Sequence, residues 1–249
     1  MKPAKKDTQL IMGRHPVVDA LKADIPLERV WLSRQIRGPF EKEVRQLSKE
    51  KGITLQYVPK ERLDKTVRGN HQGIIAWRAL IEFQDIEQVI PHIFESGAVP
   101  LIVVLDGVTD VRNFGAIARS AEVMGAQAMV IANQNAARVN ADAVKTSAGA
   151  LNVIPVCRVN SLPVAVEYLQ QCGIQVLVSS LEAEKPLFEL DLKEPTAFVL
   201  GAEDKGVSRA VARIADHQFI IPQAGQTDSL NVSVAAGMLL VETVRQRDY

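Results

Sequence analysis

Residues 100–106 have the sequence Pro-Leu-Ile-Val-Val-Leu-Asp, and residues 197–201 have the sequence Ala-Phe-Val-Leu-Gly. Each stretch is almost continuously apolar and ends at a polar residue or a glycine. Parallel strands have this pattern, because helices cover both faces of their sheet. The two stretches therefore predict an open α/β sheet, whose ligands bind beyond the carboxyl ends of the strands.

Further apolar segments alternate with helical patterns on both sides of these stretches. From residue 99 onward we expect strands at 99–105, 127–132, 151–156, 174–179, 196–200 and 217–221, with helices at 113–125, 140–149, 161–172, 206–215 and 229–246. The first part predicts a smaller α/β domain, with helices at 10–23 and 40–51, a short helix after Pro59, and strands at 29–33, 53–58 and 73–77. We therefore expect a domain over residues 1–80, a linker with one helix over 81–98, and a larger domain over 99–249.

The composition is that of a globular protein. The chain has 249 residues, of which 47% are hydrophobic and 23% charged. This apolar content argues against disorder, and no apolar run approaches the ~20 residues that a membrane span needs. Cys157 and Cys172 form neither a disulfide framework nor a Cys-x-x-Cys pair. We expect a soluble, cytoplasmic protein with no metal site and no membrane partner.

The formal net charge of zero hides an uneven distribution. Residues 1–80 carry 17 Lys and Arg against 9 Asp and Glu, whereas residues 81–249 carry 12 against 20. A basic module joined to an acidic one favours docking of the first on a polyanion such as a nucleic acid. The alternative is chance combined with a solvated, lysine-rich helix at 41–51.

The common catalytic motifs do not account for the chain. It has no Gly-x-Gly-x-x-Gly fingerprint, and Val207 stands where a P-loop would need its lysine after Gly206. The four histidines are scattered without the spacing of metal ligands. Metal chemistry and a Ser-His-Asp mechanism therefore have no support.

Three segments at the carboxyl ends of expected strands carry polar residues that could form a site. The first contains Asn113, an expected helix N-cap, and Arg119, which points away from the apolar stripe of its helix. The second places Glu203 between two glycines. The third begins a buried helix with Ser229 and Asn231. Taken singly, each also fits an ordinary reading: a solvated Arg119, a strand–helix turn, and a polar helix cap.

Taken together, the three segments resemble the motifs of the SpoU/TrmH branch of the SPOUT methyltransferases. The matching motifs are Asn-x-Gly-Ala-Ile-x-Arg-Ser-Ala at 113–121, Gly-x-Glu-x-x-Gly at 201–206 and Ser-Leu-Asn-Val-Ser-Val-Ala-Ala-Gly at 229–237. Val111 departs from the family, which usually has proline there. Residues 13–21 and 71–76 also resemble the basic, L30e-like substrate-binding domain of family members that act on 23S rRNA.

This resemblance implies a fold, a reaction and a set of roles. It implies a trefoil knot in the larger domain, a homodimer, and methyl transfer from S-adenosylmethionine to the ribose 2′-OH of a guanosine in 23S rRNA. The implied catalytic residues are Arg119, Asn113, Glu203, Ser229 and Asn231, and the implied cofactor-binding residues are Leu200, Gly201, Ile221 and Leu230. A tRNA ribose methyltransferase and a non-catalytic RNA-binding or ribosome-assembly factor remain the alternatives.

Overall fold

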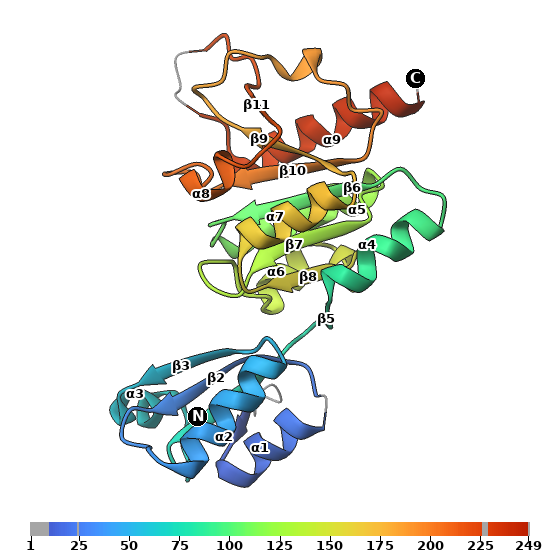
Figure 1. Cartoon of the computed structure of the whole chain (residues 1–249). Helices are drawn as coiled ribbons and strands as arrows, with labels where there is room; N and C mark the ends of the chain where they lie inside the picture. Colours follow the sequence, from blue (N-terminus) through green and yellow to red (C-terminus); the bar gives the residue numbers. More distant parts are fainter. Residues whose placement is uncertain (1–9, 24, 226–228, 249) are drawn as a thin grey trace. The chain divides into compact units, whose positions relative to one another are not determined.

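The computed structural model describes residues 10–23, 25–225 and 229–248. The chain divides into two compact units, Met1–Glu82 and Phe83–Tyr249, which are coloured blue and green to red in Figure 1. Residues 1–9 of the expected first domain lie outside the described part of the chain. Each unit has its own sheet and is described separately.

Over its described residues, unit 1 consists of a four-stranded mixed sheet and three helices. The sheet order is β1-β4-β2-β3, in which β4 runs antiparallel to β1 and β2, and β2 runs parallel to β3. Its core joins one face of α1 to the central strands through Val17, Leu21, Val30, Leu32 and Ile74, all at most 1% exposed. The elements are β1 (Leu10–Met12), α1 (Arg14–Lys22), β2 (Leu27–Ser33), α2 (Pro39–Glu50), β3 (Thr54–Val58), α3 (Lys60–Thr66) and β4 (Ile74–Arg78).

The start of unit 1 differs from the expected helix over residues 10–23. Leu10–Met12 forms a strand paired with β4, and the helix begins only at Arg14. Gly13 separates the two elements with a φ of 99°, a conformation outside the helical region that glycine adopts without steric cost. The apolar Leu10 and Ile11 therefore belong to a strand and not to the first turn of the expected helix.

In the part of unit 2 that the structure describes, seven strands form one sheet in the order β11-β9-β10-β6-β7-β8-β5, and every pairing among them is parallel. The strands that the apolar stretches predicted, β6 and β10, lie side by side in its centre. The elements are β5 (Phe83–Gln84), α4 (Ile86–Glu95), β6 (Leu101–Asp106), α5 (Val111–Val123), β7 (Ala128–Ala132), α6 (Ala141–Thr146), β8 (Val156–Val159), α7 (Leu162–Gln171), β9 (Gln175–Ser179), β10 (Thr196–Gly201), α8 (Arg209–Ala212), β11 (His217–Phe219) and α9 (Val232–Asp248).

Helices cover both faces of this sheet. Alternate strand residues such as Ile102, Val104 and Val199 form one core cluster with α4, α7 and Val211 of α8. Figure 1 shows α4 and α7 together on that face. On the opposite face, α5 packs against both α6 and α9. β5 and α4, which lie within the expected linker over residues 81–98, belong to this unit through their strand pairing and core contacts.

β8 begins later than expected. Residues 151–156 are apolar enough to resemble a strand, but Ala150–Asn152 forms a short 3-10 helix and the strand starts at Val156. Pro155 has no backbone N–H to donate to the sheet, so it marks the edge of the strand. Its carbonyl oxygen still accepts a hydrogen bond from the Met129 N–H at 2.9 Å.

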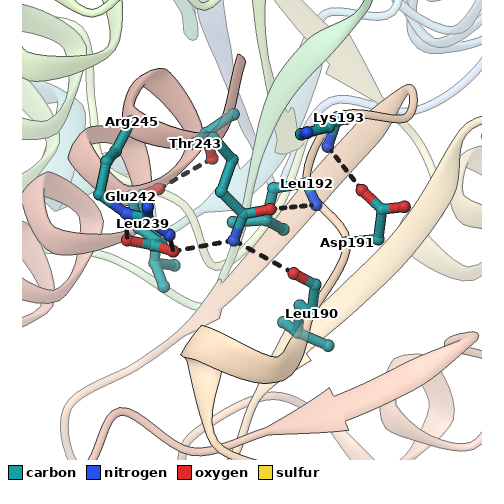
Figure 2. A network of polar contacts seen from close by, with 9 residues as sticks. Leu190, Asp191, Leu192, Lys193, Leu239, Glu242, Thr243 and Arg245 are labelled. Atoms are coloured by element: carbon teal, nitrogen blue, oxygen red, sulfur yellow. Dashed lines mark hydrogen bonds and ion pairs between the residues drawn. The ribbon is translucent and has the colours of Figure 1, made fainter. Parts of the chain in front are cut away.

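The last helix, α9, is fixed to the rest of the unit by two groups of polar contacts. The Arg247 guanidinium donates to the carbonyl oxygens of Leu192, Val99, Pro100 and Glu194 at 2.8–3.0 Å, which joins the helix end to the segments before β6 and β10. One turn earlier lies a second network, shown in Figure 2.

The second network is centred on the buried carboxylate of Glu242. Arg245 donates two hydrogen bonds of 2.8 Å to it, and Gln246 donates one of 2.8 Å. Gln246 in turn contacts the backbone of Leu190 and Leu192, so the segment before β10 is tied to α9. The bonds from Arg245 and Gln246 lower the pKa of Glu242 to about 2.

No helix in the described part of the chain combines the length and the apolar character needed to cross a membrane.

Candidate active site

The loop after β10 is a tight ring. The Gly206 N–H donates to the Ala202 carbonyl oxygen at 2.8 Å, and the Ala202 N–H donates to the Gly206 carbonyl oxygen at 3.2 Å. A Cβ at Gly201 would come within 2.0 Å of the Gly206 carbonyl carbon, so only glycine allows the ring to close. The closed ring leaves Glu203 exposed at its tip.

The neighbouring strand holds the far end of this loop. The Asp106 carboxylate, at the end of β6, accepts a hydrogen bond from the Ser208 N–H at 2.8 Å. Because β6 and β10 are paired in register up to Asp106 and Gly201, their carboxyl ends are fixed side by side. The ring is therefore held at both ends.

α5 begins beside the ring, two residues earlier than expected. Its N-cap is Asp110, whose carboxylate accepts from the backbone N–H groups of Arg112 and Asn113 at 2.7 and 2.8 Å. The expectation that Asn113 caps the helix is wrong, because Asp110 satisfies these free N–H groups instead. The Asn113 side chain is thereby left available, and its Nδ2 donates to Glu203 Oε1 at 3.0 Å.

Asn231, just before α9, completes a cluster of three side chains. Its Nδ2 lies 2.7 Å from Glu203 Oε1 and 3.1 Å from Asn113 Oδ1. Its Oδ1 accepts from the backbone N–H and the hydroxyl of Ser233 at 2.9 and 2.6 Å. These two bonds orient the amide so that its NH₂ group faces Glu203. The structure thus joins one residue from each of the three motifs, 90 and 28 positions apart along the chain.

A hollow of about 610 Å³ opens beside this cluster, at the carboxyl ends of β9, β10 and β11. Leu200, Gly201, Ile221 and Leu230 all line it, together with Glu203 and Ser229. Its volume lies within the ~300–1,000 Å³ of small-molecule sites. Among the described residues, no group of three or more His, Cys, Asp or Glu side chains could hold a metal ion.

Arg119 lies apart from the hollow. It is exposed on α5 and is absent from the described residues that line the hollow. Six residues along an α-helix amount to about 9 Å of rise and about 240° of rotation, so Arg119 and Asn113 face different directions. The structure brings together Asn113, Glu203 and Asn231 but does not bring Arg119 to them.

Sequence reasoning missed several residues of the site. The segment 178–182, which runs from the end of β9 into the following loop, lines the hollow, as do Arg209 and Arg213 around α8. Asp106 and Asp110, which position the loop and α5, were also missed. The available signal was the parallel sheet itself, because the carboxyl ends of neighbouring parallel strands meet at one edge.

With this geometry established, comparison with known proteins assigns the class. Residues 100–241 match the SpoU rRNA Methylase family, and residues 10–79 match the RNA 2′-O ribose methyltransferase substrate binding family. The chain therefore belongs to the SpoU family of RNA methyltransferases.

Individual relatives span almost the whole chain. The 23S rRNA (guanosine-2′-O-)-methyltransferase RlmB of Pseudomonas aeruginosa is 37% identical over 95% of this chain and 96% of its own. A putative TrmH family tRNA/rRNA methyltransferase of Bacillus subtilis, YacO, is 35% identical over 96% of each chain. Among solved structures, the SpoU methyltransferase AviRb of Streptomyces viridochromogenes in complex with AdoMet is 25% identical and has a TM-score of 0.61, over 96% of this chain and 90% of its own.

Proposed function

We propose that the protein transfers a methyl group from S-adenosylmethionine to the ribose 2′-OH of a guanosine in 23S rRNA. The observation that carries the proposal is the Asn113–Glu203–Asn231 cluster at the edge of the hollow, built from the three motifs of the family. The likeness to RlmB supports the rRNA substrate. A cytoplasmic location follows for an enzyme that acts on this RNA.

The hollow fits the cofactor in size and in chemistry. Leu200, Ile221 and Leu230 offer apolar surface for a base, and the backbone around Gly201 offers hydrogen-bonding groups to the sugar and amino-acid parts. When bound, the cofactor supplies an activated methyl group on a sulfonium, so the reaction needs no metal. The residues of the chain must then orient the nucleophilic hydroxyl and either accept its proton or polarise its O–H bond.

The three-residue cluster acts as a rigid positioning unit. The Glu203 carboxylate accepts from two amides, which satisfies much of its hydrogen-bonding capacity and disfavours other rotamers. Asn113 retains one N–H donor and one lone pair on Oδ1 for the ribose of the target nucleotide, whereas the amide of Asn231 is fully used within the cluster and by Ser233. Ser229, which lines the hollow, would hold the loop before α9 around that nucleotide.

Arg119 supplies the positive charge that the reaction needs near the nucleophilic hydroxyl. A guanidinium stays protonated in proteins and is a poor proton acceptor, so orienting a phosphate that polarises the hydroxyl is easier than direct proton removal. Since Arg119 does not line the hollow of its own protomer, we assign its action to the hollow of a second copy in a homodimer.

α9 provides a surface for that second copy. Val234, Met238 and Val241 are 47%, 43% and 52% exposed and follow one another at helical spacing. The opposite face of α9, including Ala235, is already buried against the sheet and α5. An exposed apolar stripe on a helix that also packs against the helix carrying Arg119 is typical of a subunit interface.

The function is tested by methyl transfer to purified RNA. The full chain is incubated with methyl-labelled S-adenosylmethionine and either 23S rRNA or tRNA from cells that lack the protein. We expect label on a guanosine ribose of 23S rRNA, detected as a 2′-O-methylated nucleoside after digestion. Label on tRNA alone would assign the tRNA alternative. RNA binding without any transfer would contradict the enzymatic function.

A further inference from the structure

Unit 1 contains a cavity of its own that the reaction does not use. It has a volume of about 520 Å³ and lies between the end of β2, the start of α1, the start of α3 and the loop at 69–73. All of its walls come from unit 1. Its volume is sufficient for a nucleotide-sized group, within the ~300–1,000 Å³ of known ligand sites.

Three cations converge on this cavity. Arg14, Arg37 and Lys60 line it from three different elements, and Asp64 is the one carboxylate among the described lining residues. Arg14 is held in place, because its guanidinium lies 4.8 Å from the centre of the Phe40 ring and its backbone N–H donates to Gln72 Oε1 at 2.9 Å. Like charges fixed around one hollow favour an anionic ligand, and three of them suit a phosphate.

The carboxylate is oriented by a buried histidine. The Gly73 N–H donates to Nδ1 of His71 at 2.9 Å, so Nδ1 carries no proton and Nε2 donates to Asp64 Oδ1 at 2.7 Å. His71 is only 4% exposed, whereas the Asp64 side chain is 54% exposed. Asp64 is thus held with Oδ2 able to accept a further hydrogen bond from a ligand in the cavity.

We propose that this cavity binds a nucleotide of the RNA substrate, with its phosphate on Arg14, Arg37 and Lys60 and its ribose 2′-OH donating to Asp64. This inference rests on the proposed function for the identity of the substrate. A carboxylate in a purely phosphate-binding site would only repel the ligand. Next to a ribose it accepts the one hydroxyl that distinguishes RNA from DNA.

The cationic part of the site is tested with a pair of charge-matched double variants of the full chain. R37Q/K60Q removes two charges from the cavity, and K42Q/K49Q removes two exposed charges from α2, outside it. Binding of undermethylated 23S rRNA is measured at several salt concentrations. We expect the affinity to fall about tenfold or more for R37Q/K60Q and less than about threefold for K42Q/K49Q. An equal loss in both variants would overturn the proposal.

The carboxylate is tested with D64N, whose amide oxygen can still accept from His71. Short single-stranded RNA and DNA of the same sequence are compared, with guanosine monophosphate as a competitor. We expect the preference for RNA to fall about tenfold in D64N, while binding of DNA is unchanged or tighter because a negative charge is lost. Equal tightening for RNA and DNA would show a bare anion site, and preferential binding of the free nucleotide would also contradict the proposal.

Kinetics separate this inference from the proposed function. If both hold, R37Q/K60Q raises KM for RNA and leaves kcat at saturating RNA within about twofold. If the wild-type chain binds RNA with the expected variant pattern but transfers no methyl group, the cavity assignment stands and the enzymatic function fails. If methyl transfer occurs but KM for RNA is the same in R37Q/K60Q and K42Q/K49Q, the cavity assignment fails alone.

Discussion

The polar site in unit 1 and the polar site in unit 2 differ in how far their own residues satisfy their charges and hydrogen bonds. In the cavity of unit 1, three cationic side chains face a shared hollow and outnumber the one carboxylate among its described lining residues, Asp64. In unit 2, the Asn113–Glu203–Asn231 cluster satisfies itself through three hydrogen bonds of 2.7–3.1 Å. The first arrangement suits gripping a polyanion, whose phosphates supply the missing charge. The second suits holding reacting groups in a fixed geometry.

This difference gives physical meaning to the uneven charge of the chain. Affinity for RNA is expected to depend on unit 1 and to be sensitive to salt, whereas the rate of the chemical step is expected to depend on unit 2. Substitutions in unit 2 should therefore lower kcat with little change in RNA affinity. The predictions below test that division, from the largest expected effect to the smallest.

Arg119→Ala should lower kcat by about 1,000-fold, since it removes a charge that acts on the transition state. Arg119→Lys should also lower kcat severely, because the ammonium group of lysine lacks the planar, two-pronged hydrogen-bonding geometry of a guanidinium. Single-turnover methyl transfer at saturating RNA measures the effect, and cofactor affinity within about threefold of wild type is the control. Near-normal rates in Arg119→Lys would contradict the phosphate-orienting role.

Glu203→Ala should lower kcat by about 10- to 100-fold, because both amides of the cluster lose their shared acceptor. Asn231→Ala should have a similar effect, and the double variant should be little worse than either single one, since the residues act as a unit. A double-mutant cycle on single-turnover rates measures the coupling. Simple multiplication of the two losses would show that the cluster is not one unit.

Arg247→Ala should destabilise unit 2 by about 2–4 kcal/mol, because four carbonyl oxygens lose a charged donor. Burial lowers the pKa of this guanidinium, but its hydrogen bonds keep it in the interior of the fold. Denaturant unfolding followed by circular dichroism gives the loss. RNA affinity of the folded variant should be unchanged if unit 1 carries the binding, and a parallel loss of affinity would argue against the division.

Glu242 should make stability depend on acid pH. Its pKa is lowered from 4.5 to about 2 in the folded protein, so its contribution is fully present above pH 4.5 and is lost as the pH falls toward about 2. Comparison of wild type with Glu242→Gln isolates this contribution in unfolding experiments at pH 6 and pH 3. The stability gap between the two proteins should narrow at pH 3. A constant gap would exclude the network of Figure 2 as its source.

The parallel sheet and the motif residues were predictable from the sequence because they depend on local patterns. Buried apolar stretches mark β6 and β10, and polar residues follow at their carboxyl ends. Element ends were less predictable, because they depend on single residues that compete for the same backbone groups. Asp110 rather than Asn113 caps α5, and Pro155 delays β8.

The parts of the site that depend on long-range contacts were not predictable. Nothing in the pattern shows that Asn231 would contact Asn113, 118 residues earlier. The trefoil knot is an expectation that rests on the resemblance alone, because ordinary topology rules favour unknotted sheets. The direction in which Arg119 points relative to the hollow depends on packing of α5 against its neighbours, which helical spacing alone does not give.

The central claim, that Arg119 of one protomer serves the Glu203 cluster of another, is tested most directly by mixing two variants that are each strongly impaired. Arg119→Ala and Glu203→Ala are unfolded together, refolded as mixed dimers and assayed for methyl transfer. In the mixed dimer, one site combines the intact Glu203 of the first variant with the intact Arg119 of the second. We predict recovery of about a quarter of wild-type activity, from random pairing with one working site in each mixed dimer. No recovery, with mixed dimers demonstrably formed, would contradict the account.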